Sequence, residues 1–227
     1  DASSITPALI KETLHEEDGI EANVASGYHA IEFMLWGQDL NGTGPGAGAR
    51  PHTDYLQGEG CTGGNCDRRA AYLKAATDLL VADLEEMAAN WAEAGAARAA
   101  VTADPVAGVQ AMLTGMGSLS YGEQAGERMK LGLMLNDPEE EHDCFSDNTH
   151  ASHLNDAIGI ASAYTGEYTR VDGTKLTGPS LSELVAAKDA ALDAEMKGKL
   201  EKTLNAMNAM AERAQTKEAY DQMIGEG

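Results

Sequence analysis

The sequence has few basic residues, and this scarcity limits the partners of the protein. Its 227 residues include 16 Lys and Arg against 37 Asp and Glu, a formal net charge of −21. Such a surface repels phosphate backbones and anionic lipids, and it attracts cations. We therefore expect no nucleic-acid partner, although the acidity is also explained by solubility alone.

Long apolar runs are missing as well. No stretch approaches the roughly 18–20 apolar residues that a membrane-spanning helix needs, so no transmembrane segment is expected. The first residues, DASSITPALIKETLHEEDG, have neither the basic start nor the apolar centre of a signal peptide.

The fingerprints of common enzyme classes are absent. The sequence contains no G-x-S-x-G elbow, no phosphate-binding loop and no dinucleotide fingerprint. HEEDG at 15–19 lacks the second histidine of the zinc-protease helix H-E-x-x-H. HAIEF at 29–33 matches the inverted form H-x-x-E-H except that Phe33 stands at the place of the second histidine. No catalytic residue is therefore assigned.

Cysteine is scarce, with three residues in the chain. Cys61 and Cys66 enclose the Gly-rich run CTGGNC, in which the chain can bend back, so a disulfide is geometrically plausible and would favour an oxidising compartment. Free thiols and a zinc site are the alternatives, but two thiols leave a tetrahedral zinc shell half empty. Cys144 is interpreted as a small buried hydrophobic residue.

What the sequence does contain favours helices. Apolar residues recur at spacings of three and four after Thr6-Pro7, from 67 to 91, after Asp104-Pro105 and from Ser180 onward, whereas strand patterns are almost absent. Ser180 and Glu183 fit a capping box. The pattern predicts an all-α protein built as an antiparallel helix bundle. Residues 37–65 are the exception, because nine glycines and two prolines there predict a long loop without regular structure.

Two ionisable residues stand inside an apolar run, GYHAIEFMLWGQD at 27–39. On a helix, His29 and Glu32 occupy positions i and i+3, with Cβ atoms roughly 5–6 Å apart on one face. They can then reach one ion together. The plain alternative is a buried, hydrogen-bonded contact.

A second polar group occupies 139–153, where Asp137-Pro138 predicts the start of a helix. On that helix two neighbouring faces carry imidazoles and carboxylates: Glu139, His142, Ser146, Thr149 and His153 on one, and Asp143, Asp147 and His150 on the next. This arrangement is either a solvated polar face or a partly buried cluster that must be paired or bind something.

These segments resemble the imelysin family. GYHAIEFMLWGQD is similar to the G-x-H-x-x-E signature of that family, with Gly27, His29 and Glu32 in the defining places. EHDCFSDNTH at 141–150 resembles its second recurrent segment, and CDRRAAYLKAATDLLVADL is similar to the branch of the iron-regulated protein A. The resemblance covers essentially the whole chain. It implies two four-helix-bundle-like halves: 1–95, with the signature helix and the Gly-rich loop, and 104–227.

The resemblance also implies a function. We expect a protein of the periplasm or cell envelope of a bacterium, linked to iron uptake, that binds a metal ion or an iron-bearing ligand and works with an envelope iron-transport partner. Iron is the first choice of metal and zinc the second, since imidazole and carboxylate together suit Fe, Zn, Cu or Mn. His29 and Glu32 are the expected ligands, with His142, Asp147 and His150 completing the shell from another helix.

Other interpretations stay open. Some family members are described as peptidases, which makes a zinc-dependent peptidase the first alternative, and an adhesion or scaffold bundle without a metal is the second. Asp39, Arg50 and Asp54 follow the signature and are candidates for supporting the ligands. Family members extend beyond both ends of this sequence, so the chain is expected to be a piece of a longer protein.

Overall fold

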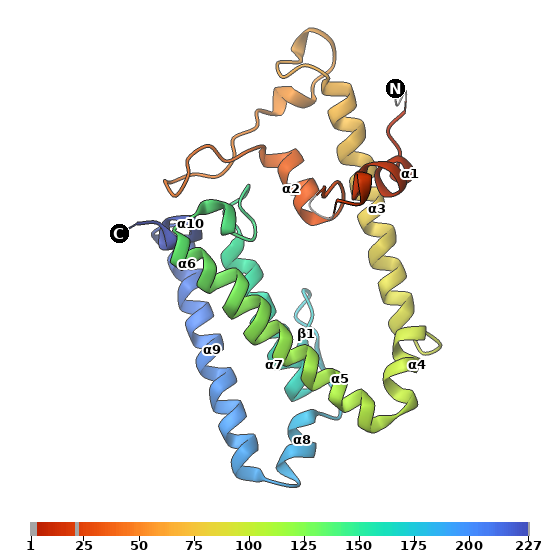
Figure 1. The fold of residues 1–227 in the computed structure, drawn as a ribbon, viewed down its shortest axis with the longest axis vertical. Helices are drawn as coiled ribbons and strands as arrows, with labels where there is room; N and C mark the ends of the chain where they lie inside the picture. Colours follow the sequence, from red (N-terminus) through yellow and green to blue (C-terminus); the bar gives the residue numbers. More distant parts are fainter. Residues whose placement is uncertain (1–3, 21–22, 227) are drawn as a thin grey trace. The chain divides into compact units, whose positions relative to one another are not determined.

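Helices dominate the structure, a computed structural model that describes residues 4–20 and 23–226 (Figure 1). The α-helices are α1 (Pro7–Leu9), α2 (Tyr28–Trp36), α3 (Cys66–Trp91), α4 (Ala96–Ala103), α5 (Pro105–Gly117), α6 (Leu131–Leu135), α7 (Thr149–Thr165), α8 (Leu181–Ala186), α9 (Ala190–Thr216) and α10 (Tyr220–Ile224). Two π-helical segments, η1 (Ile10–Leu14) and η5 (Ser118–Lys130), and the 3₁₀ turns η2 (Glu17–Gly19), η3 (His52–Tyr55), η4 (Gly58–Gly60) and η6 (Pro138–Glu140) join them. The predicted all-α class is confirmed.

One small hairpin departs from the helical pattern. Strands β1 (Glu167–Thr169) and β2 (Lys175–Thr177) pair antiparallel, with Tyr168 opposite Leu176. Every residue of both strands is exposed, so the hairpin adds nothing to a core. Within the described residues, no helix is long and apolar enough to cross a membrane.

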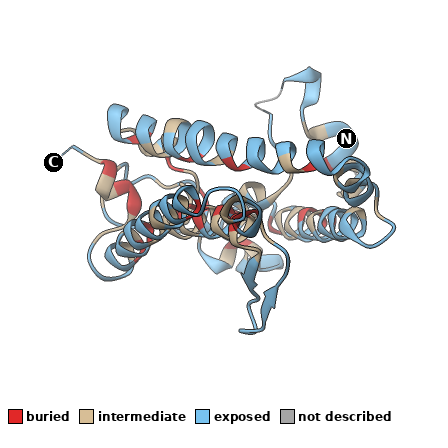
Figure 2. Cartoon of the chain, turned by 90° about the horizontal axis from the view of Figure 1, so that it is seen from below, coloured by how far each residue is buried: buried red, intermediate tan, exposed pale blue. Residues whose placement is uncertain are grey.

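The chain divides into two compact units, residues 1–41 with 46–99 and residues 42–45 with 100–227. The core of the first unit consists of Ile10, Ala75, Ala76 and Leu79, where α3 packs against the N-terminal segment. The predicted helix over 67–91 is confirmed as α3. Its buried residues all lie between Cys66 and Leu79, however, and Figure 2 shows how much helix surface is exposed.

The Gly-rich segment 37–65 is held in place by a buried carboxylate. Asp54 lies 3.4 Å from the Arg50 guanidinium and accepts a hydrogen bond from the Thr62 hydroxyl at 3.2 Å. A Cβ at position 63 would meet the Asp54 carboxylate at 2.4 Å, so Gly63 is required for this close approach. The predicted disulfide between Cys61 and Cys66 is confirmed, with an S–S distance of 2.05 Å.

The second unit is built on long helices that alternate in direction. Helix α5, η5 and α6 follow one another without a break from 105 to 135, and α7 and α9 pack together beside them (Figure 1). The core residues are Met116, Ile160, Tyr164 and Leu181. The capping box of Ser180 and Glu183 is confirmed. The apolar pattern from 181 to 207 is split, because the Asp189 side chain caps a new helix at Ala190.

Two segments with a helical apolar pattern are interrupted. The helical segment that follows Thr6-Pro7 ends at Leu14. Glu16, Asp18 and Gly19 then take positive φ, and α2 begins at Tyr28; residues 21 and 22 lie outside the described part. The predicted helix from 139 to 153 was wrong over its first half. There η6 is followed by turns, Asp147 has φ +54°, and α7 starts only at Thr149.

The disulfide is expected to stabilise the first unit. Cys61→Ser should lower its free energy of unfolding by about 2 kcal/mol, the chain-entropy value for so short a loop. Both tryptophans, Trp36 and Trp91, belong to this unit. Urea unfolding followed by tryptophan fluorescence therefore reports on it, with Cys144→Ser, which removes a cysteine outside the disulfide, as the control. Equal midpoints for wild type and Cys61→Ser would contradict the expectation.

Candidate functional site

Helix α2 carries the first candidate pair. Gly27 and Gly37 flank the helix with φ of +87° and +76°, values that favour glycine at both ends. His29 Nδ1 lies 3.0 Å from Glu32 Oε2, as the i, i+3 spacing predicts. The Glu32 residue is 8% exposed, whereas the His29 side chain is 41% exposed. The pair thus joins a buried carboxylate to a more accessible imidazole.

The loop after α2 anchors that helix. Arg50 Nη2 donates to the Phe33 carbonyl at 3.2 Å, and its guanidinium lies 5.4 Å from the centre of the Phe33 ring. The Tyr55 hydroxyl donates to the Met34 carbonyl. Arg50 in turn pairs with Asp54. These bonds fix the backbone directly after Glu32, so Arg50 and Asp54 support the helix that carries the pair.

Asp39, the third residue predicted to support the metal ligands, forms hydrogen bonds with a residue two positions along the chain. Its Oδ1 accepts from the backbone N–H of Asn41 at 2.8 Å and from the Asn41 side chain at 2.9 Å. These bonds shape the turn that follows the helix.

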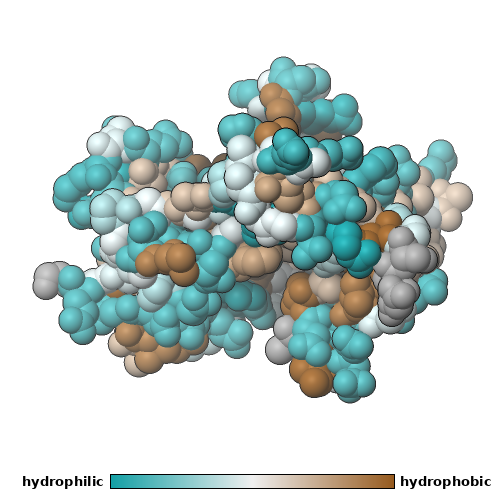
Figure 3. Space-filling view, turned by 90° about the horizontal axis from the view of Figure 1, so that it is seen from above, coloured by the Kyte–Doolittle hydropathy of each residue, from teal (hydrophilic) through white to brown (hydrophobic). Residues whose placement is uncertain are grey.

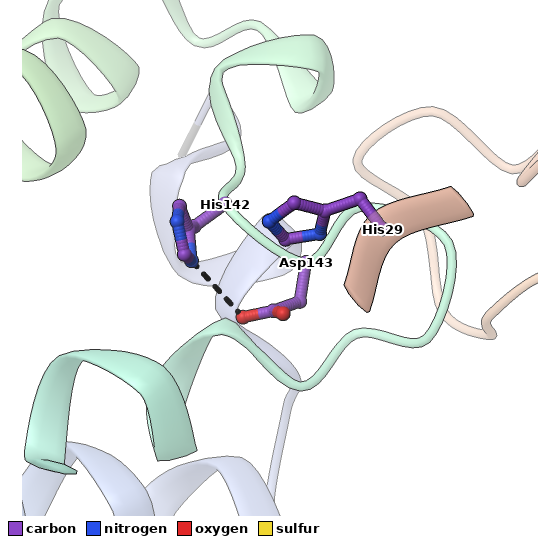
Figure 4. Close-up of side chains that lie close together, drawn as sticks. All are labelled: His29, His142 and Asp143. Atoms are coloured by element: carbon purple, nitrogen blue, oxygen red, sulfur yellow. Dashed lines mark ion pairs between the residues drawn. The ribbon is translucent and has the colours of Figure 1, made fainter. Parts of the chain in front are cut away.

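In the second unit, the chain from 138 to 148 folds back onto the start of α7. The Asp143 N–H donates to the Thr149 hydroxyl at 2.8 Å, and the Ser152 hydroxyl donates to the Asp143 carboxylate. His142 Nδ1 lies 3.4 Å from Asp143 Oδ2, the ion pair drawn in Figure 4. A histidine beside a carboxylate therefore occurs in this unit too.

The three predicted ligands of this segment occupy different parts of it. His142 and Asp147 lie on the turns, and His150 lies in the first turn of α7, each partly buried. Among the described residues, ligand atoms of these three do not fall together within 4.8 Å. A common metal site for them stays a prediction.

Two ionisable residues that the sequence reasoning did not select are the most buried of this region. His153 is 1% exposed and Glu141 is 4% exposed. His153 belongs to the buried stripe of α7 with Ala157, Ile160 and Tyr164, at helical spacings of four, three and four. This spacing can be read from the sequence, and it indicates that His153 lies on the buried face of the helix.

Burial changes the pKa of both groups in opposite directions. It raises the pKa of the Glu141 carboxyl to about 8, helped by the carboxylates of Asp147, Asp221 and Asp143, while Thr149 offsets part of the rise. It lowers the pKa of the His153 imidazole to about 4, helped by the nearby His142. Both side chains are therefore neutral between about pH 5 and 7.

Fold and chemistry together define a helical protein whose units each carry a histidine beside a carboxylate. The sequence model of the imelysin family (Peptidase M75) matches residues 1–226. The chain belongs to the imelysin family, as its G-x-H-x-x-E segment predicted. A comparison with curated proteins gave no match.

The pKa of Glu141 predicts how stability depends on pH in metal-free protein. The folded state keeps this proton up to about pH 8, while an unfolded glutamate loses it near pH 4.5. Unfolding therefore releases a proton between these values, and stability falls as the pH rises. From about pH 6 to pH 8, the free energy of unfolding of the wild type should fall by about 2 kcal/mol relative to that of Glu141→Gln.

Urea unfolding followed by circular dichroism measures this difference. Exposed Glu139 provides the control, and Glu139→Gln should follow wild type at both pH values. If the free energy of unfolding changes equally with pH in wild type and Glu141→Gln, the folded carboxyl is not protonated as described.

Proposed function

We propose that this chain is an imelysin-like metal-binding protein that serves iron uptake in the periplasm or envelope of a bacterium. Family membership supports a metal-related role. The disulfide supports an oxidising compartment, because such bonds are rare where thiols are kept reduced. The large excess of Asp and Glu over Lys and Arg favours the approach of cations. Hydrophilic residues cover much of the face shown in Figure 3.

The His29–Glu32 contact carries the proposal. A carboxylate that bonds one imidazole nitrogen fixes the tautomer and orientation of the ring and makes the other nitrogen a better ligand. With Glu32 on Nδ1, a metal would bind His29 through Nε2. Direct binding by Glu32 as well requires this carboxylate to turn from the imidazole to the ion. Nitrogen and oxygen donors suit iron, and they also suit zinc and manganese.

His142, Asp147 and His150 are proposed as further ligands in the second unit. His142 beside Asp143 repeats the histidine–carboxylate arrangement of α2, at 3.4 Å. The proposal extends to an iron-bearing ligand and to an envelope iron-transport partner, which the family resemblance suggested. Iron is the proposed physiological metal, and zinc is the alternative.

A zinc-dependent peptidase is the second candidate, favoured by the peptidase name that the family carries. Peptidase chemistry needs a metal with an open position and a free general base. Glu32 is bonded to His29 instead, and Phe33, under the Arg50 guanidinium, stands where a second histidine ligand would be. These contacts favour metal binding without turnover.

Metal titration tests the proposed ligands. His29→Ala and Glu32→Ala should each weaken binding of Fe²⁺, Zn²⁺ and Mn²⁺ by about tenfold or more, because even supporting residues cost that much. Glu32→Gln keeps a hydrogen-bond acceptor for the imidazole and should weaken binding less if Glu32 only orients the ring. Isothermal titration calorimetry measures each affinity.

Exposed residues of the neighbouring loop serve as matched controls. His52→Ala and Glu59→Ala should bind these metals as wild type does. If His29→Ala and Glu32→Ala also bind as wild type does, the pair is a structural contact and the scaffold alternative gains support.

The peptidase alternative has its own test. Purified protein loaded with Zn²⁺ should not hydrolyse casein at an enzymatic rate, for lack of a free base. Hydrolysis that survives further purification and disappears in Glu32→Ala would replace our proposal with the peptidase.

A further inference from the structure

The second unit contains a cavity of about 390 Å³ between its long helices. Helix α7 packs against both η5 and α9, and residues of these three elements and of α5 line the space. Gln124 of η5 donates to the His153 carbonyl of α7 at 2.6 Å and so joins two sides of the cavity. The volume falls within the range of roughly 300–1,000 Å³ that small-molecule sites occupy in proteins.

The inner lining of this cavity is apolar. Four of its residues are each at most 9% exposed: Met116, Ala157, Ile160 and Met207. Methionine is frequent in the lining, at positions 116, 129, 196 and 207, and its flexible side chain adapts to the shape of a ligand. Among the described residues that line the cavity none is aromatic, so the lining suits an aliphatic chain better than a stacked ring.

Polar residues lie at the opening of the cavity. Ser120, Lys199 and Thr203 belong to the lining and are exposed. Lys199 alone is charged among the described lining residues, in a chain with 37 Asp and Glu. Its amine pairs with Glu195 at 2.8 Å, but both side chains are exposed, and such a pair contributes little stability. The Lys199 amine can therefore turn to another anion at small cost.

The conformation of η5 supports a binding role for the cavity. This segment is π-helical over 13 residues, Ser118–Lys130. Ser120, Gln124 and Met129 line the cavity from it, at spacings of four and five. π-Helical segments are rare, mostly a single turn long, and frequent at functional sites.

We propose that the cavity binds an aliphatic carboxylate, with the hydrocarbon chain among the methionines and the carboxylate beside Lys199. Burial of the chain removes apolar surface of both ligand and protein from water. The carboxylate stays at the solvent-exposed opening, where it gains a cationic partner. The described lining residues include none of the proposed metal ligands, so the inference is independent of the proposed function.

Calorimetric titration of the full chain with three ligands of equal chain length tests this inference. The ligands are decanoate, 1-decanol and decyltrimethylammonium, each below its micelle concentration. Decanoate should bind at one site and most tightly of the three. The formal net charge of −21 favours the opposite order for adsorption to the surface, because it attracts the cation and repels the carboxylate.

Two variants locate the ligand. Ala125→Phe fills the space from an exposed lining position and should abolish decanoate binding, whereas Ala194→Phe, exposed on α9 outside the lining, should not. Lys199→Gln should weaken decanoate by about threefold, the scale of an exposed ion pair, and leave decanol unchanged. Lys202→Gln is its control, at an exposed position of the same helix. Because Lys199→Gln changes an exposed side chain, it tests the head group even if Ala125→Phe disturbs the fold.

The other results would overturn the inference. Equal decanoate affinity in wild type and a folded Ala125→Phe places the ligand elsewhere. Decyltrimethylammonium binding more tightly than decanoate indicates attraction to the acidic surface in general. Absence of decanoate binding also contradicts the inference, and a dimer that Ala125→Phe dissociates would then identify a second copy of the chain as the occupant.

Discussion

A polar side chain that folding removes from water must find a partner, and this constraint organises both units. In the first unit, Arg50 and Thr62 meet Asp54 and thereby order the Gly-rich segment. In the second, Asp193 ties three helices together. Buried groups that break the rule are therefore informative, and His153, whose two ring nitrogens have no hydrogen-bond partner among the described residues, is one of them.

The fold could be predicted where local signals decide the structure. Helices begin as expected after the capping Asp104 with Pro105 and at the capping box of Ser180 and Glu183. The long apolar pattern of α3 is helical as well. The prediction failed where single residues adopt left-handed conformations. Asp147 is such a residue, and nothing in its neighbours' apolar spacing marks it.

The candidate site, too, could be predicted only where local spacing decides which residues meet. The contact between His29 and Glu32 follows from helical spacing, so the sequence was enough. The burial of Glu141 depends on tertiary packing, since Asp221, whose carboxylate helps to raise the pKa of Glu141, lies far along the chain. A sequence pattern carries no such information, and Glu141 was not selected for that reason.

Both units of this imelysin-family chain pair an imidazole with a carboxylate, His29 with Glu32 and His142 with Asp143. The proposed function depends most on metal binding by His29, oriented by Glu32. Crystals soaked in Mn²⁺ and measured for anomalous scattering test this most directly. A peak is expected at bonding distance from His29 Nε2. Peaks confined to exposed carboxylates, with none at His29, would contradict it.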